Sequence, residues 1–203
     1  MTSTADGSSS LALPVLDADL EARLRARMVE VEERLEREIK SEASFVTNAA
    51  RHLMHAGGKR FRPLLVLLAA ETGDPTREGV VTAACVVELT HLASLYHDDV
   101  MDEADVRRGT PSANAAYGNS TAILVGDLLF GTASDIVADL GPQAVKIQAR
   151  TFIRLCSGQI RDTRRAPEGV DATDYYLQVL ADKTGAKVVA ERPAQRGHPG
   201  QVR

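Results

Sequence analysis

The sequence predicts an all-α protein built as an antiparallel helix bundle. In every long apolar segment the apolar residues recur at intervals of three and four, which is the period of an amphipathic helix. None of these segments shows the two-residue alternation of a half-buried strand. Short breaks containing Gly or Pro separate the segments, at Gly73–Pro75, Arg108–Pro111, Gly141–Pro142 and Ala166–Gly169. Helices joined by such short connections pack as bundles and build ligand sites between facing helices.

The first expected helix begins at Asp17 or Asp19, because either carboxylate can cap it, and runs to about Lys40. Its apolar side is formed by Leu20, Leu24, Met28, Val31, Leu35 and Ile39. The second starts at Ser41 or Ser44 and ends at Gly57. Further helices are expected at about 63–72, 78–102, 112–117, 119–139, 142–162 and 171–184. The sequence has no internal repeat.

The two ends differ from this helical region, which spans residues 17–186. Residues 1–16 are rich in Ser and Thr and lack the basic start of a signal peptide, so a disordered segment is expected. Residues 187–203 contain two prolines and two glycines without a helical apolar period. We therefore expect an irregular tail there.

Composition narrows the function classes. The formal net charge of -4 over 203 residues argues against bulk binding of nucleic acid. The apolar runs look too short and too often interrupted by charge to cross a bilayer, so any membrane contact is expected to be peripheral. Cys85 and Cys156 lack metal-type spacing and are expected to be reduced, buried thiols of a cytoplasmic protein.

An acidic cluster followed by two arginines is the most informative segment. Asp98 and Asp102 stand four residues apart, so on a helix both carboxylates project from one face. Mg²⁺ is typically held by one or two carboxylates together with substrate phosphates. Arg107 and Arg108 follow closely, and guanidinium groups match phosphate oxygens. The pattern predicts a magnesium-held diphosphate.

Two other interpretations of this cluster remain open. One is a solvated acidic helix end followed by a basic turn, against which stands the buried-looking apolar run of residues 80–96. The other is a calcium loop, which fits poorly because the glycine required at the sharp turn is missing.

A second cationic cluster lies upstream in Gly57-Gly-Lys-Arg-Phe-Arg-Pro63, directly before an apolar run. Its glycines allow the backbone to approach a ligand, and Pro63 suits the first turn of a helix. Lys59 and Arg62 would then lie near a helix N-terminus, which favours anions. This is a candidate second phosphate site, although a basic turn alone is more often plain surface.

His91 lies seven residues before Asp98, two helical turns along the same face, which places it near the site. A lone histidine on an apolar helix is more often a core residue than a ligand. His52, His55 and His97 have no such support and are left unassigned.

Four blocks together resemble the trans-type isoprenyl diphosphate synthases, and among them the long-chain polyprenyl diphosphate synthases. The blocks are Gly57–Pro63, residues 88–111, residues 119–131 and Lys183-Thr184-Gly185, within a similarity that covers about residues 20–186. The resemblance implies an isoprenoid-synthase helix bundle, magnesium as cofactor, isopentenyl diphosphate and an allylic diphosphate as substrates, and a homodimer in full-length members.

The resemblance also implies individual roles. Lys59, Arg62, His91 and Arg108 would face isopentenyl diphosphate, and Asp98 and Asp102 would bind magnesium. Arg107, Lys183 and Thr184 would hold the allylic diphosphate. Asp98, Asp102, Arg107 and Lys183 are accordingly the predicted catalytic residues. Ala93 and Ser94 occupy the chain-length position, and their small volume favours a long product.

The family carries a second Asp-Asp-x-x-Asp motif, and this sequence contains none. We therefore expect a C-terminally truncated or frameshifted member whose bundle is incomplete at the C-terminus and whose prenyltransferase activity is impaired. Two rival functions remain: a non-catalytic partner subunit, and a helical interaction module with merely superficial charges. Magnesium-dependent diphosphate binding distinguishes these functions: the enzyme should bind, the interaction module should not, and the partner subunit need not.

Overall fold

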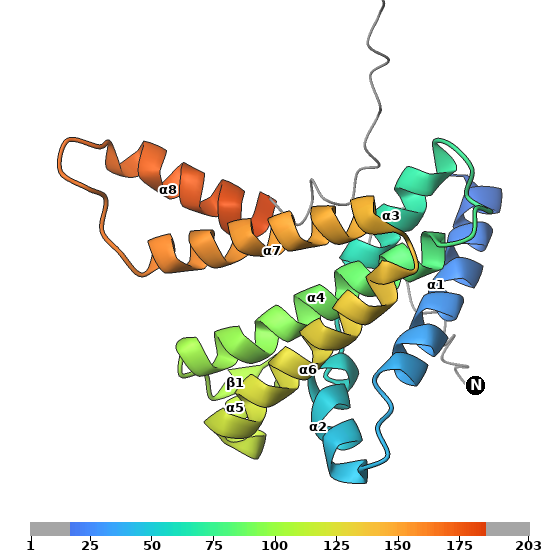
Figure 1. The fold of residues 1–203 in the computed structure, drawn as a ribbon, viewed down its shortest axis with the longest axis horizontal. Helices are drawn as coiled ribbons and strands as arrows, with labels where there is room; N and C mark the ends of the chain where they lie inside the picture. Colours follow the sequence, from blue (N-terminus) through green and yellow to red (C-terminus); the bar gives the residue numbers. More distant parts are fainter. Residues whose placement is uncertain (1–16, 186–203) are drawn as a thin grey trace, which may run out of the picture. The chain divides into compact units, whose positions relative to one another are not determined.

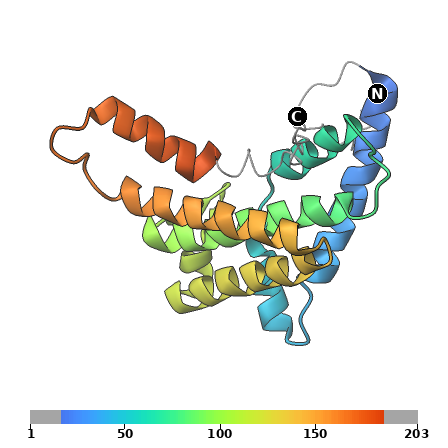
Figure 2. The ribbon, with the colours of Figure 1, turned by 45° about the horizontal axis from the view of Figure 1, so that its top comes forward.

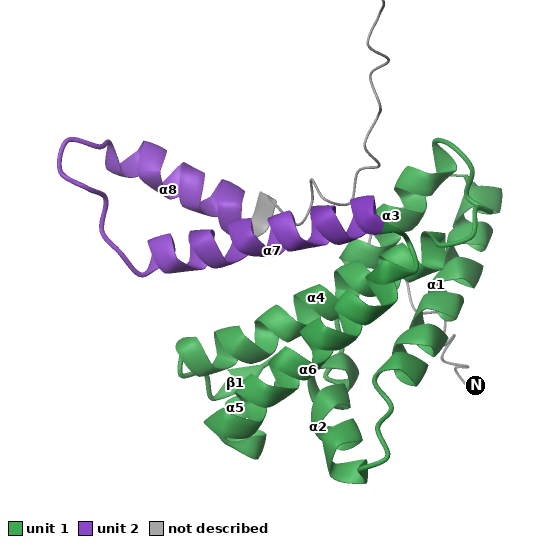
Figure 3. Cartoon of the chain, in the orientation of Figure 1, with its two compact units in different colours: residues 1–141 green, residues 142–203 purple. Residues whose placement is uncertain are grey.

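The computed structural model describes residues 17–185, which fall into two compact units divided after Gly141 (Figure 3). The first unit contains six helices among its described residues (Figure 1). They are α1 (Ala18–Glu38), α2 (Ser44–His55), α3 (Phe61–Glu71), α4 (Val80–Met101), α5 (Ala113–Tyr117) and α6 (Asn119–Ala138). The second unit contains α7 (Pro142–Asp162), α8 (Ala172–Leu180) and the π-helical turn η1 (Ala181–Gly185). The predicted all-α class is confirmed. The two terminal segments expected to be irregular lie outside the described residues.

The long helix α4 is the centre of the first unit. It lies side by side with α6 in both views (Figures 1 and 2) and also contacts α1, α2, α3 and α5. Tyr96, fully buried on α4, ties this helix to α2: its hydroxyl accepts the Leu53 N–H at 3.2 Å and lies within hydrogen-bond distance of the Ala49 and Ala50 carbonyls. Such a buried hydroxyl needs partners, and the backbone of α2 supplies them.

The predicted start of α1 is confirmed at its cap. The Asp17 carboxylate accepts the N–H groups of Asp19 and Leu20 at 2.9 and 3.1 Å. An acidic side chain there satisfies free amides and complements the helix dipole. The helix then buries Leu24, Val31 and Leu35 on one side.

A small hairpin departs from the purely helical expectation. Strands β1 (Val106–Arg107) and β2 (Thr110–Pro111) pair antiparallel, with Arg107 opposite Thr110. Both residues of the connecting loop, Arg108 and Gly109, have positive φ (53° and 81°). Two positive φ angles in a two-residue loop are typical of a type I′ turn, whose twist suits the paired strands. Strands of two residues are too short to give an alternating pattern.

In the second unit, α7 closely approaches η1 at Gly158. A Cβ atom at Gly158 would lie 2.6 Å from the Lys183 backbone nitrogen, so only glycine fits without a shift. The helix expected at 171–184 is instead α8 followed by the π-helical turn. Asp182 in that turn pairs with Arg154 and Arg161 of α7 at 3.1 and 2.8 Å.

Helices α4 and α6 are long and apolar enough to cross a membrane, contrary to our expectation that no apolar run would be. However, 67% of the apolar window of α4 is buried inside the structure, and 39% of that of α6. Helices buried in a protein core meet the same criterion. Length and composition alone therefore do not indicate insertion.

Candidate active site

Asp98 and Asp102 lie one turn apart at the C-terminal end of α4. The Asp102 N–H donates to the Asp98 carbonyl at 2.8 Å, and the Asp102 side chain is exposed. The negative end of the helix dipole lies here, together with the exposed acidic residues Glu103 and Asp105. This accumulation of negative charge favours a bound cation, as the spacing predicts.

Asp99, between them in sequence, is fully buried and has a different role. Its carboxylate accepts the Ala113 N–H at 2.8 Å at the start of α5, and the Arg107 Nε–H of the hairpin. It therefore joins the end of α4 to the following segment. Sequence reasoning did not assign Asp99, although it follows Leu92 and Tyr96 on the buried face at helical spacing.

Arg107 is thus held at the acidic end of α4. Its side chain remains 25% exposed while its Nε–H bonds to Asp99. The structure places it beside the aspartate motif, and its predicted contact with the allylic diphosphate remains a prediction.

Arg108 extends from the same hairpin to the basic loop. Its guanidinium donates to the Leu53 carbonyl at 3.2 Å and to the Gly57 carbonyl. A Cβ at Gly58, where φ is +145°, would lie 2.6 Å from Arg108 Nη1. Gly58 therefore matters here for close approach, although the approaching group within the protein is Arg108.

The structure thereby brings the two predicted cationic clusters together around Glu88. This glutamate of α4 is buried, with 3% of its side chain exposed, and burial raises the pKa of its carboxyl group. The positive charges of Arg60, Arg62 and Arg108 oppose that rise, with the largest effect from Arg60 and the smallest from Arg108. Burial also lowers the pKa of Arg108, against the charge of Glu88.

The remaining predicted residues of the first unit occupy nearby positions. Lys59 is exposed in the loop, and Arg62 is partly buried in the first turn of α3. His91 lies on α4 one turn beyond Glu88 and is partly buried. Ala93 and Ser94 are buried on the same helix, where the Ser94 hydroxyl donates to the His91 carbonyl at 2.7 Å.

Lys183 is described within the second unit, where its Nζ lies 2.8 Å from Asp162 Oδ2. The side chain of Thr184 lies outside the described residues. A shared site of these two residues with Asp98 and Asp102 therefore remains a prediction.

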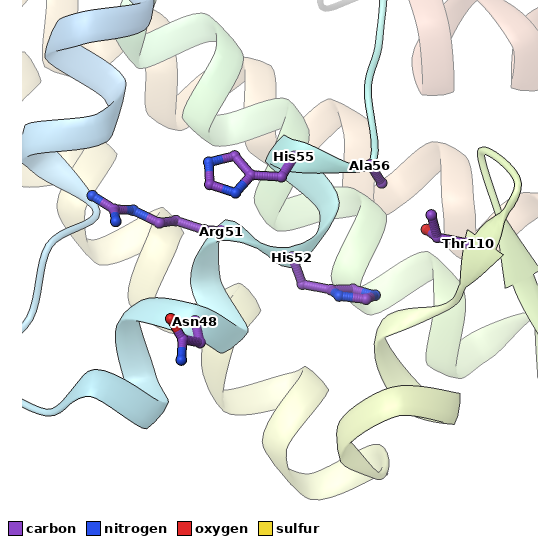
Figure 4. A pocket seen from close by; sticks show the side chains of 6 residues that line it. All are labelled: Asn48, Arg51, His52, His55, Ala56 and Thr110. Atoms are coloured by element: carbon purple, nitrogen blue, oxygen red, sulfur yellow. The ribbon is translucent and has the colours of Figure 1, made fainter.

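The three unassigned histidines have protein partners. His97 Nε2 lies 3.2 Å from both the Ile123 carbonyl and Asp127 Oδ1 on α6. His52 and His55 line an open pocket of about 370 Å³ (Figure 4) with Asn48, Arg51, Ala56 and Thr110. There His52 bonds to the Pro111 carbonyl at 2.7 Å, and His55 and Arg51 both bind Glu36. The polar groups of this pocket are thus largely engaged by the protein itself.

The donor set fits magnesium better than a metal bound by protein alone. Within residues 17–185, no three His, Cys, Asp or Glu side chains come close enough to hold a metal ion. Two carboxylates one turn apart leave coordination positions for water and phosphate oxygens, which Mg²⁺ prefers to keep.

Comparison with known proteins identifies the family. The polyprenyl synthetase family model matches residues 43–195, a range that extends past Ala186, where we expected the similarity to end. The chain is 50% identical over 175 residues to the nonaprenyl diphosphate synthase of Mycobacterium tuberculosis, covering 86% of this chain and 52% of that protein. It is 41% identical over 161 residues to heptaprenyl diphosphate synthase component 2 of Geobacillus stearothermophilus, covering 79% and 50%. The chain belongs to the polyprenyl synthetase family.

Solved structures agree on the fold. A decaprenyl diphosphate synthase from Rhodobacter capsulatus matches with a TM-score of 0.79 at 34% identity, covering 85% of this chain and 54% of that one. A geranylgeranyl pyrophosphate synthase from Corynebacterium glutamicum, complexed with calcium and isoprenyl diphosphate, matches with a TM-score of 0.77 at 46% identity, covering 88% and 55%. The chain spans about half the length of the relatives it matches.

Proposed function

We propose that this protein is a prenyltransferase that condenses isopentenyl diphosphate with an allylic diphosphate to make a polyprenyl diphosphate. The observation that carries the proposal is the hairpin at residues 106–111. Its adjacent arginines contact the aspartate end of α4 on one side and the Gly57–Gly58 loop on the other. One short segment thus links a cation-favouring carboxylate pair to a cluster of phosphate-favouring side chains.

In this proposal Lys59, Arg62, His91 and Arg108 bind the isopentenyl diphosphate. Asp98 and Asp102 would hold Mg²⁺, which when bound supplies positive charge to the diphosphate of the allylic substrate. Arg107, Lys183 and Thr184 contribute further donors to that diphosphate. The C. glutamicum relative is complexed with both a divalent cation and an isoprenyl diphosphate, which supports this pairing of ligands.

The proposed reaction requires no nucleophilic side chain. The allylic carbon–oxygen bond breaks with both electrons leaving on the diphosphate, and the double bond of isopentenyl diphosphate forms the new carbon–carbon bond. A proton is then lost to an oxygen of the departed diphosphate, and the electrons of the broken carbon–hydrogen bond restore a double bond. The side chains of this protein orient the two diphosphates and stabilise the negative charge that develops as one departs. We expect the reaction to occur in the cytoplasm, with peripheral membrane contact by the apolar product.

A partner-subunit role is the second candidate. One relative is named component 2 of a heptaprenyl diphosphate synthase, which supports partnership between unlike chains in that protein. We nevertheless favour the enzyme, which we expect to act as a homodimer, because the carboxylate pair and the basic loop are both present here. A chain that served only as a partner would not need either group.

The metal assignment is tested by replacing Asp98 or Asp102 with asparagine, with Asp135→Asn, at an exposed carboxylate on α6, as the matched control. Calorimetric titration of farnesyl diphosphate should show that Mg²⁺ tightens binding to the wild type and to the control, but not to either site variant. In a preparation that turns over, each site variant should lose on the order of a hundredfold in rate. Unchanged magnesium dependence in both site variants would contradict the assignment.

A further inference from the structure

Arg60, which sequence reasoning left without a role, connects three helices. Its Nε lies 2.6 Å from Glu32 of α1, its Nη1 lies 3.1 Å from Glu88 of α4, and its Nη2 donates to the Met54 carbonyl of α2 at 2.9 Å. Only 11% of its side chain is exposed. The residue itself caps α3 in the left-handed region, with φ at 44°.

These contacts use the geometry specific to arginine. A guanidinium presents five donors in a planar fork, so it can bind two carboxylates and a carbonyl at once. A lysine at the same position would place its charge on a single nitrogen, which could not reach all three partners at once. Because Glu88 is almost fully buried, loss of Arg60 would leave its carboxylate with only the weaker effects of the Arg62 and Arg108 charges.

The loop that Arg60 holds carries the residues proposed to bind isopentenyl diphosphate. Lys59 precedes Arg60 and is exposed, and Arg62 follows in the first turn of α3. The Gly57 carbonyl, in the same loop, accepts a hydrogen bond from Arg108. The inward contacts of Arg60 therefore fix the backbone conformation of the loop that carries Lys59 and Arg62.

We propose that Arg60 is a positioning residue: through its ion pairs with Glu32 and Glu88 it holds the loop of residues 57–62 in the form that binds diphosphate, without touching the ligand. The inference rests on the proposed diphosphate site. Arg60 faces inward, whereas its neighbours Lys59 and Arg62 are the residues proposed to bind the substrate.

The test is calorimetric titration of isopentenyl diphosphate into the full 203-residue chain. Arg60→Lys keeps the charge but removes the fork, and it should raise the dissociation constant about tenfold or more, because small misplacements of binding groups are costly. Arg34→Lys is the matched control. Arg34 also links α1 to α4, with its Nη1 2.6 Å from Thr82 Oγ1 and its Nε 3.2 Å from Glu38 Oε1, but it holds no part of the loop. Arg34→Lys should change the dissociation constant less than about twofold.

The Glu88→Gln variant provides a second test, because the two possible roles of Glu88 predict opposite changes in diphosphate affinity. If Glu88 were only a negative charge near an anion, its neutralisation would tighten diphosphate binding. If it acts by holding Arg60, its neutralisation should weaken binding, and Arg60→Lys combined with Glu88→Gln should cost less than the sum of the single variants. Hydrogen exchange of residues 57–62 should accelerate in both single variants, whatever their thermal stability.

Wild-type affinity in Arg60→Lys, or tighter binding in Glu88→Gln, would overturn the positioning role while leaving the diphosphate site intact. Absence of saturable binding to the wild-type chain would overturn the site itself, and the positioning role with it. Should Arg60→Lys fail to fold, Glu32→Gln decides, because the Glu32 side chain is 40% exposed and Arg60 would still be paired with Glu88. Unchanged affinity and loop exchange there would overturn the proposal.

Discussion

Two neighbouring aspartates at the end of α4 have opposite environments. Asp98 lies on the face that it shares with Asp102, whereas Asp99 is fully buried against Arg107 and the start of α5. A helix turns by about 100° per residue, so adjacent side chains reach different surroundings. Asp98 is therefore a proposed metal ligand, whereas Asp99 has a structural role.

The small residues one turn before Asp98 support the prediction of a long product. Ala93 is buried on α4, with 1% of it exposed, and a ring there would exclude the growing chain from the path that we expect this small side chain to leave open. In a preparation that elongates, Ala93→Phe should shorten the polyprenyl products seen by chromatography. Ala83→Phe, on the same helix and nearer its start, should not. An unchanged product distribution in Ala93→Phe would mean that the growing chain does not pass this face.

At the scale of elements, the contact between α4 and α6 depends on a glycine. The His97 ring of α4 occupies the space that a Cβ at Gly126 would fill, and the ring is held there by the Ile123 carbonyl and Asp127. A Cβ at Gly131, on the same helix, would meet no heavy atom within 4 Å beyond its own stretch of α6. The two glycines therefore provide a matched pair.

We predict that Gly131→Ala raises the free energy of unfolding by about 0.5–1 kcal/mol, because alanine favours a helix over glycine. Gly126→Ala should be at least about 1 kcal/mol less stable than Gly131→Ala, since the added methyl displaces the His97 ring from its hydrogen bond. Urea unfolding measures both values. Equal gains from the two alanines would show that the close approach at Gly126 carries no energetic weight.

The elements that the sequence predicted well are those with a long apolar period. The ranges of α1, α4, α6 and α7 agree with expectation to within about two residues, because each is a long segment in which apolar residues recur at helical spacing. The hairpin and the π-helical turn were missed because neither is long enough to show a period. Their conformations depend instead on tertiary contacts, such as Arg107 with Asp99 and Gly158 with η1.

The candidate site shows a similar division. Spacing along one helix was enough to pair Asp98 with Asp102. The inward direction of Arg60 could not be predicted, because nothing in the local sequence distinguishes it from Lys59 or Arg62. Its partners, Glu32 and Glu88, are each 28 residues away in the chain.

At the scale of the whole molecule, the two units carry different parts of the proposed machinery. The first holds the aspartate pair, the hairpin and the basic loop, whereas Lys183 belongs to the second. The relatives are about twice as long as the matched region, and this sequence has no second aspartate-rich motif. We therefore expect the 203-residue chain to bind a diphosphate without elongating an allylic substrate efficiently.

The most direct measurement is calorimetric titration of isopentenyl diphosphate into the 203-residue chain and its Lys59→Ala/Arg62→Ala variant. We predict saturable binding to the wild type and a dissociation constant raised at least about tenfold in the variant, because each lost cation removes a charge-assisted hydrogen bond to phosphate. Lys40→Ala, which removes an exposed cation at the end of α1, should bind like the wild type. Absence of binding to the wild type, or equal binding by all three proteins, would contradict the assignment of a diphosphate site to the basic loop.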